Sequence, residues 1–169
     1  MSTNQEISNL TKSYIKTAML ELLSKQRYDK ISITDLVARA GVSRTAFYRN
    51  YSSKDDLIED IVHDLIESTN IDIQLFLNYN VKELETFYNC LRSRKKEIEI
   101  ITKASLENLH ILNHKKDLAC EIIKRNTEKQ YEDAAIGGAI NAIVYKWILE
   151  NMNETDEEMA KITYKIIHK

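Results

Sequence analysis

Apolar side chains recur at intervals of three and four residues along most of the chain, the spacing that places them on one face of an α-helix. The first such stretch predicts a helix over residues 6–25. Its expected apolar face consists of Leu10, Tyr14, Ala18 and Leu22, with Ile15, Met19 and Leu23 beside them. We expect this broad face to pack into a core.

Capping residues divide the next stretch, residues 32–50, into two short helices. Ser32 can cap a second helix through its hydroxyl, and Asp35 stands in the first turn, where the helix dipole favours an acid. Gly41 suits the left-handed conformation in which many helices end. Ser43 can then cap a third helix over residues 44–50.

The apolar pattern continues through the rest of the chain with little punctuation. Ser53 can cap a fourth helix that begins near Lys54 and continues out of the small N-terminal head. Further helices are expected near residues 81–94, 96–103, 108–125, 128–151 and 154–168. The acids of the fourth helix, interpreted as a solvated face or as a charge that repels DNA, are Asp55, Asp56, Glu59, Asp60, Asp64 and Glu67.

Composition supports an all-α fold, because the chain has no proline and only three glycines. We expect a three-helix head over residues 1–53 and a helical body over residues 54–169. Residues 1–54 hold nine Lys/Arg against four acids, whereas the remainder holds 15 against 22. A basic head on an acidic body suits a DNA-binding protein, although chance clustering on solvated helices would give the same counts.

Several other classes of protein fit the sequence poorly. Cys90 and Cys120 are thirty residues apart and form no C-x-x-C pair, so they indicate neither a disulfide framework nor a zinc signature. The apolar run 134–149 is short for a membrane span and contains Asn141 and Lys146, and the polar N-terminus lacks a signal peptide, so we expect a cytoplasmic protein. We find no nucleophile motif or phosphate-binding glycine loop, and expect no enzyme activity, cofactor or metal.

The segment 32–54 has the division of labour that a DNA-reading helix needs. Phe47 and Tyr51, four residues apart, can anchor the third helix, while Arg44, Tyr48 and Arg49 fall on or beside its other face. Arginine can hold guanine through two hydrogen bonds, and hydroxyl or basic groups beside it can bind phosphate. The alternative is a structural helix pair with a solvated basic face.

These residues also carry a family resemblance. Ala40-Gly41-Val42-Ser43, Phe47-Tyr48, Tyr51, Lys54 and Leu57 resemble the DNA-binding domain of the TetR (tetracycline repressor) family of bacterial transcription regulators over residues 11–64. The family often has histidine where Asn50 stands, and an amide can still donate to phosphate. The candidate DNA-binding residues are Thr34, Ser43, Arg44, Thr45, Tyr48, Arg49, Asn50 and Lys54.

The resemblance implies a homodimer that binds a roughly palindromic DNA operator, mostly as a repressor, and leaves DNA when a small-molecule effector enters the body. The residues expected at the dimer interface are Ile140, Ile143, Val144, Trp147, Ile148, Met159, Ile162 and Ile166. An intramolecular core is the alternative for this apolar face, and both roles can hold at once. The sequence assigns no ligand-binding residue and does not identify the effector, the operator or the sign of regulation.

Two further possibilities remain at this stage. A protein of the same fold can act as a coactivator or scaffold through a protein partner, in which case binding to DNA would not show the steep salt dependence of a DNA reader. His110 and His114 are four residues apart and could share a metal, but no third ligand is evident, and ordinary histidines are the better interpretation.

Overall fold

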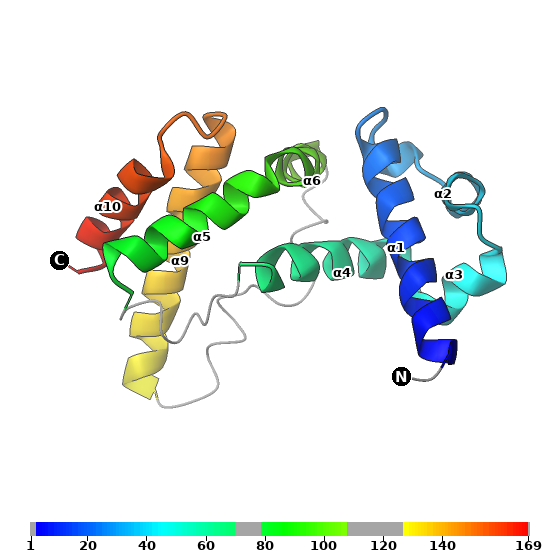
Figure 1. Ribbon diagram of the computed structural model, residues 1–169, viewed down its shortest axis with the longest axis horizontal. Coiled ribbons are helices and arrows are strands. Elements are labelled where there is room, and N and C mark those ends of the chain that lie inside the picture. The colour runs from blue at the N-terminus through cyan, green and yellow to red at the C-terminus, as the bar shows by residue number, and fades with distance from the viewer. Residues whose placement is uncertain (1–2, 70–78, 108–126, 169) are drawn as a thin grey trace. The chain divides into compact units, whose positions relative to one another are not determined.

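The computed structural model describes residues 3–69, 79–107 and 127–168, and every regular element in these ranges is a helix (Figure 1). This confirms the all-α prediction. The elements are α1 (Thr3–Leu23), the 3₁₀ turn η1 (Tyr28–Lys30), α2 (Ile33–Ala40), α3 (Arg44–Asn50), α4 (Lys54–Glu67), α5 (Val81–Ser93), α6 (Lys95–Glu107), α9 (Thr127–Leu149) and α10 (Asp156–Ile167). None of the described helices is long and apolar enough to span a membrane.

The predicted helix bounds agree with the structure wherever a capping residue marked the end. Both α2 and α3 begin directly after Ser32 and Ser43, as expected. In contrast, α6 runs to Glu107, four residues beyond its predicted end, where no polar break had been identified. The helix expected over residues 108–125, with His110 and His114, lies outside the described residues.

The chain forms two compact units, residues 1–63 with 99–112 and residues 64–98 with 113–169. Both α4 and α6 pass from one unit into the other along the chain. The division expected after residue 53 stays a prediction.

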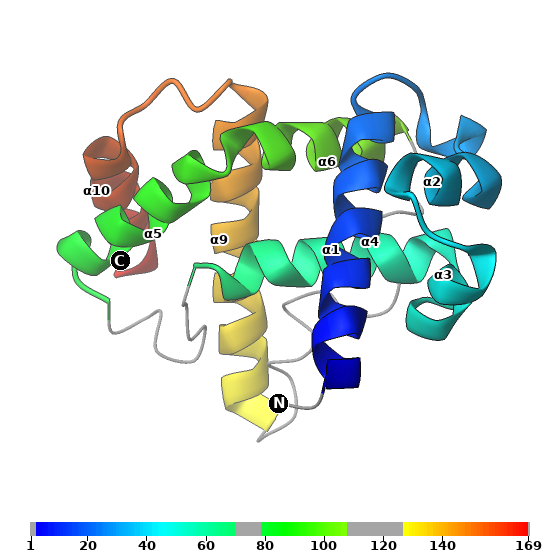
Figure 2. The same ribbon diagram turned by 45° about the vertical axis from the view of Figure 1, so that its right-hand side comes forward.

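In the first unit, α1 packs against α2 and α3 and crosses α4 (Figure 2). The prediction of its apolar face was wrong in part. Leu10 and Tyr14 are 54% and 52% exposed. The side chains of α1 that are buried are Ile15, Ala18, Met19 and Leu23. They meet a core that includes Leu36, Phe47, Leu57 and Ile58, all nearly inaccessible to solvent.

In the second unit, α5 and α10 lie side by side and Trp147 of α9 completes the core (Figures 1 and 2). The ring of Tyr88 meets that of Trp147 edge-on, with the centroids 5.1 Å apart. The Tyr88 hydroxyl is 2.5 Å from that of Thr163, and burial raises the pKa of Tyr88 to about 12. The shared hydroxyl bond satisfies two polar groups that this core would otherwise leave unpaired.

Candidate nucleic-acid interface

The helix before the reading helix begins with a reciprocal cap. Ser32 Oγ accepts from the N–H of Asp35 at 3.1 Å, and the Asp35 carboxylate accepts from the N–H of Ser32 at 3.2 Å. Hydrogen bonds from Ser32 hold the pKa of Asp35 below its usual value. This capping box fixes the first turn of α2, from which Thr34 is exposed.

The turn between α2 and α3 depends on one glycine. Gly41 has a φ of 67°, and the N–H of Val42 donates back to the carbonyl of Val37 at 3.1 Å. A Cβ at Gly41 would meet nothing within 4 Å, so the backbone angle, and not space, calls for glycine here. The turn therefore sets the direction in which α3 leaves α2.

The inner side of α3 is fixed by a cap and two aromatic rings. Ser43 Oγ accepts from the N–H of Ala46 at 3.0 Å, as its position predicted. Phe47 is 0% exposed and Tyr51 is 4% exposed, with ring centroids 5.8 Å apart. Tyr48 stands edge-on to Phe47 at 5.3 Å while half of it remains exposed.

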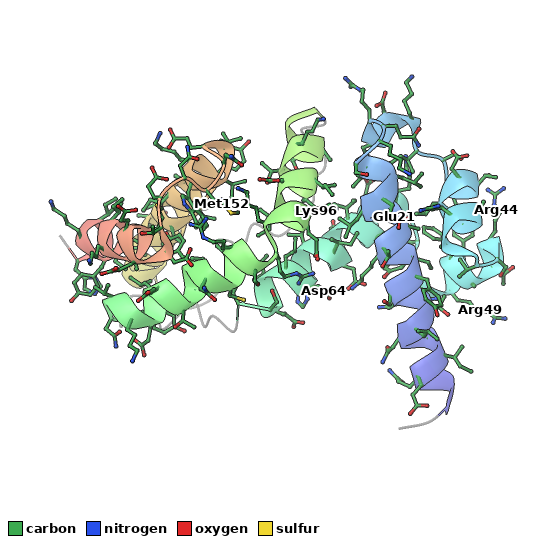
Figure 3. The ribbon with its side chains drawn as sticks, turned by 45° about the horizontal axis from the view of Figure 1, so that its top comes forward. Glu21, Arg44, Arg49, Asp64, Lys96 and Met152 are labelled. Carbon is green, nitrogen blue, oxygen red and sulfur yellow. The ribbon has the colours of Figure 1, made fainter. Side chains whose placement is uncertain are left out.

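The outer side of α3 carries polar groups that are open to solvent. Arg44 and Arg49 project from α3 on the side away from α1 (Figure 3). Thr45 and Tyr48 are exposed on the same short helix. Within the part of the chain that the structure describes, neither guanidinium forms an ion pair or a hydrogen bond. The structure thus brings these four predicted readers together on one helix with their donors available.

Asn50 and Lys54 are placed differently from the other candidates. The amide of Asn50 donates to the carbonyl of Ala46 at 2.7 Å and accepts from the hydroxyl of Ser8 at 2.9 Å. The ammonium of Lys54 donates to the backbone carbonyls of Tyr28 and Ile31. Their contacts with phosphate stay predictions, and both side chains already have protein partners.

Three acids of α4 do more than cover a solvated face. Asp55 accepts from the Tyr28 hydroxyl. The Asp56 carboxylate accepts from the N–H of Ser52 at 2.9 Å, and the N–H of Asp56 donates to Ser53 Oγ at 3.1 Å. Asp60 lies 2.9 Å from Lys16 Nζ and accepts from the Tyr51 hydroxyl at 2.7 Å. The bonds to Tyr28 and Lys16 could not be predicted, because these partners lie 27 and 44 positions away in the chain. The bonds between Asp56 and its neighbours Ser52 and Ser53 are local, and the polar residues at the start of α4 were the available signal for them.

The residues expected at a dimer interface divide into three groups by their exposure in the subunit. Trp147 and Met159 are 1% and 4% exposed and belong to the core of the second unit. Ile162 and Ile166 are 43% and 45% exposed on α10. The others, Ile140, Ile143, Val144 and Ile148, are partly exposed on α9. The dimer interface stays a prediction, and within the subunit Trp147 and Met159 are core residues.

Among the described residues, the group that could best offer ligands to a metal ion is His63, Asp64 and Glu67 on α4, with ligand atoms within 4.8 Å of one another. They lie at the surface of a single helix, where such groups are common without an ion, so we assign no metal to them.

In a comparison with known proteins, residues 15–61 match a family model described as bacterial regulatory proteins, tetR family. Two relatives from Bacillus subtilis (strain 168) are described as uncharacterized HTH-type transcriptional regulators. YvaF is 32% identical over 88 residues, which cover 52% of this chain and 46% of YvaF. YvdT is 40% identical over 55 residues, which cover 32% of this chain and 28% of YvdT. The chain therefore spans less than half the length of these curated relatives.

A solved structure is similar over nearly the whole chain. It is described as a TetR transcriptional regulator from Streptococcus agalactiae, and it matches with a TM-score of 0.60 over 97% of both chains at 18% identity. At this identity the likeness concerns the fold, and it extends beyond the head to the helical body.

Proposed function

We propose that this chain, which belongs to the TetR family of bacterial regulatory proteins, regulates transcription by placing α3 in the major groove of DNA. One observation carries the proposal. Arg44, Thr45, Tyr48 and Arg49 are exposed on a helix whose inner side is anchored by buried Phe47. A rigid inner side and free donors on the outer side are what reading of base edges requires.

Each exposed residue of α3 has a chemical role in this proposal. The guanidinium groups of Arg44 and Arg49 can each donate two hydrogen bonds to the N7 and O6 acceptors of guanine. The methyl of Thr45 can touch the methyl of thymine. The hydroxyls of Tyr48, Thr34 and Ser43 suit phosphate oxygens, which fix the register of the helix on the duplex.

We further propose that the protein acts as a homodimer on a palindromic operator. The partly exposed apolar side chains of α9 and α10 support this, because two copies could bury them together. Two heads about 34–36 Å apart would meet successive major grooves on one side of the DNA.

We also propose that the protein is a repressor that a small molecule releases. The support is that α4 begins directly after the three-helix head and runs without a break from the first unit into the second, so a change in the body could alter the spacing of the two heads. Of the residues considered as pocket lining, Phe87, Tyr88 and Ile101 are buried, whereas Phe76, Leu109 and Leu112 lie outside the described residues.

The test is sequence-selective binding to DNA by Arg44→Ala and Tyr48→Ala variants. Duplexes are first selected from a random library with the wild-type protein, and affinities are then measured by fluorescence anisotropy. We expect Arg44→Ala to weaken binding by about tenfold or more and to relax discrimination at one base position. Lys25→Ala, which removes an exposed charge in the turn after α1, is the matched control.

Unchanged selectivity in both α3 variants would reject α3 as the reading helix. Failure of the wild-type protein to select any duplex, or binding without steep salt dependence, would instead favour a coactivator or scaffold that acts through a protein partner.

A further inference from the structure

The first turn of α4 is tied to the segment that precedes α2. Lys54 Nζ donates to the carbonyl oxygen of Tyr28 at 3.1 Å and to that of Ile31 at 2.5 Å. The same nitrogen lies 4.4 Å from the centroid of the Tyr28 ring, within the range at which an aromatic face attracts a cation. An ammonium has three N–H donors, so two of them are used inside the head.

Tyr28 is held by its side chain as well as by its backbone. It is 8% exposed, and its hydroxyl donates to the carboxylate of Asp55, the residue after Lys54. Burial and the neighbouring Asp55 raise the pKa of Tyr28, which keeps the phenol protonated and able to donate. Two successive residues of α4 thus hold one buried tyrosine from two directions.

The attachment lies directly upstream of the reading helix. Ile31 is 1% exposed and is followed by Ser32, the N-cap of α2. From there α2 leads through the fixed turn at Gly41 into α3. The hydrogen bond from Lys54 to the Ile31 carbonyl therefore fixes the position of the residue just before the N-cap of α2. Through α2 it also affects the orientation of the side chains that α3 presents.

The two exposed arginines of α3 contrast with this lysine. Arg44 and Arg49 point away from the head, and within the described ranges neither has a polar partner (Figure 3). Their N–H donors are therefore available to a ligand. Lys54 is only partly exposed and has two carbonyl partners and a ring. Residue type and motif position made Lys54 a candidate phosphate ligand, whereas its surroundings are those of a structural cation.

We propose that Lys54 is a positioning residue for DNA recognition: it fastens α4 to the Tyr28–Ile31 carbonyls, thereby orients α2 and α3, and does not bind phosphate. This inference rests on the proposed function in one respect, namely that α3 reads DNA. The attachment of α4 by Lys54 can be tested without DNA. A failure of the positioning role can therefore be told apart from a failure of the proposed function.

The DNA-free test is hydrogen–deuterium exchange over residues 28–36. Lys54→Met removes the ammonium and keeps an unbranched apolar side chain. We expect the amides of this segment to exchange about tenfold faster, because the two carbonyls lose their donor. Lys25→Met, which removes an exposed lysine nearby in the sequence, should leave the exchange unchanged. Unchanged exchange in Lys54→Met would overturn the proposal.

The DNA test is the salt dependence of binding to the duplex selected by the wild-type protein. Losing one phosphate contact lowers the slope of log affinity against log salt by about 0.9 for each copy of the head. We expect Lys54→Met to bind about tenfold more weakly with an unchanged slope. A slope lowered by that amount would overturn the proposal, whatever the exchange data show.

A second variant covers the case in which Lys54→Met does not fold. Lys54→Arg keeps the charge, but its planar guanidinium cannot reproduce the compact ammonium between two carbonyls. A phosphate contact would survive in Lys54→Arg with near wild-type affinity, which would refute the positioning role. Weakened binding at an unchanged slope, together with faster exchange over residues 28–36, would support it. If the wild type selects no duplex, the proposed function fails and the exchange result alone decides the role of Lys54.

Discussion

Asp60 joins α4 to two other parts of the head through a single carboxylate. It lies 2.9 Å from Lys16 Nζ of α1 and 3.7 Å from Lys12 Nζ, and it accepts from the hydroxyl of Tyr51 at the end of α3. Burial opposes ionisation of this group, but the Lys16 ammonium and the Tyr51 hydroxyl outweigh it and hold the pKa of Asp60 below its usual value. The charged form is therefore the one that stabilises the head.

This pKa shift gives the stability of the protein a defined pH dependence. Because the pKa of Asp60 is lower in the folded than in the unfolded state, the unfolded state binds more protons in acid. The stabilisation is fully present above the ordinary aspartate pKa of 3.8 and is lost as pH falls through the lower folded value. We expect Asp60→Asn to cost about 1 kcal/mol at neutral pH and to flatten the acid limb.

Urea unfolding followed by circular dichroism from pH 7 down to acid would measure this change. Glu59→Gln, at an exposed neighbouring position, is the control and should keep the wild-type pH profile. An Asp60→Asn variant with the same acid limb as the wild type would exclude Asp60 as its source.

Arg92 plays a comparable part in the second unit. Its guanidinium bonds Asp156 Oδ1 at 2.7 Å, the carbonyl of Met152 at 2.9 Å and the carbonyl of Glu154 at 2.5 Å, and it lies over the Trp147 ring. We expect Arg92→Lys to lower the free energy of unfolding by about 2 kcal/mol. The reason is that the single nitrogen of an ammonium cannot reach all three acceptors, which the planar guanidinium bonds through separate N–H groups. Thermal unfolding against Lys161→Ala, which removes an exposed ion pair, would measure the difference.

At the scale of elements, the α9–α10 connection contains a strained turn. Asn151 and Met152 have φ of 62° and 54°, and the N–H of Met152 donates to the Trp147 carbonyl at 2.8 Å. Asn151 is exposed, whereas Met152 is 2% exposed in the core. The left-handed backbone therefore serves to turn Met152 inward after the end of α9.

The two turn residues should respond to glycine in opposite ways. Asn151→Gly relieves the left-handed backbone without losing a buried group, and we expect it to stabilise the protein by about 0.5–1 kcal/mol. Met152→Gly relieves the same strain but removes a buried side chain, so we expect a net loss of about 2 kcal/mol or more. Differential scanning calorimetry of both variants would test the pair, and equal signs would contradict this account.

Helix capping was predictable from the sequence because a cap needs only residues near it in the chain. Ser32, Gly41 and Ser43 bounded α2 and α3 correctly for that reason. The orientation of α1 was not predictable in full. Its sequence offers two overlapping apolar stripes, and only the packing of α2, α3 and α4 decides that Ile15 is buried while Tyr14 is exposed.

The candidate site shows the same limit at longer range. The exposed readers of α3 follow from helical spacing around Phe47. The roles of Asn50 and Lys54 do not, because their partners, Ser8 and the carbonyls of Tyr28 and Ile31, are 42, 26 and 23 positions away. Residue type and motif position indicated a phosphate ligand in both cases, and the fold supplies other hydrogen-bond partners for both side chains.

At the scale of the whole molecule, the proposed function requires two heads, and so depends on apolar groups that one subunit leaves exposed. Ile162 and Ile166 lie about one turn apart on α10 and remain more than two-fifths exposed, at 43% and 45%. Exposed isoleucines on the same side of a helix are costly in water unless a second surface covers them. A second copy of this chain is the partner that the proposal assigns to them.

The prediction is that Ile166→Glu converts a dimer into monomers without unfolding them. The side chain is exposed in the subunit, so its replacement should change the stability of the monomer little, while a buried charge at a two-fold interface is strongly unfavourable. Sedimentation equilibrium would give the mass, and circular dichroism the helix content. Leu10→Glu, at another exposed apolar position, on α1, is the matched control and should remain dimeric.

The same variant connects assembly to DNA binding. A monomer presents one reading helix, so Ile166→Glu should lose affinity for a two-half-site duplex while keeping its weak affinity for a single half-site. If it binds both duplexes as the wild type does, the two heads are not held together by this face, and α10 must be excluded from the interface. If the wild-type protein is itself monomeric on and off DNA, the palindromic operator fails with the dimer, and recognition rests on one α3 helix alone.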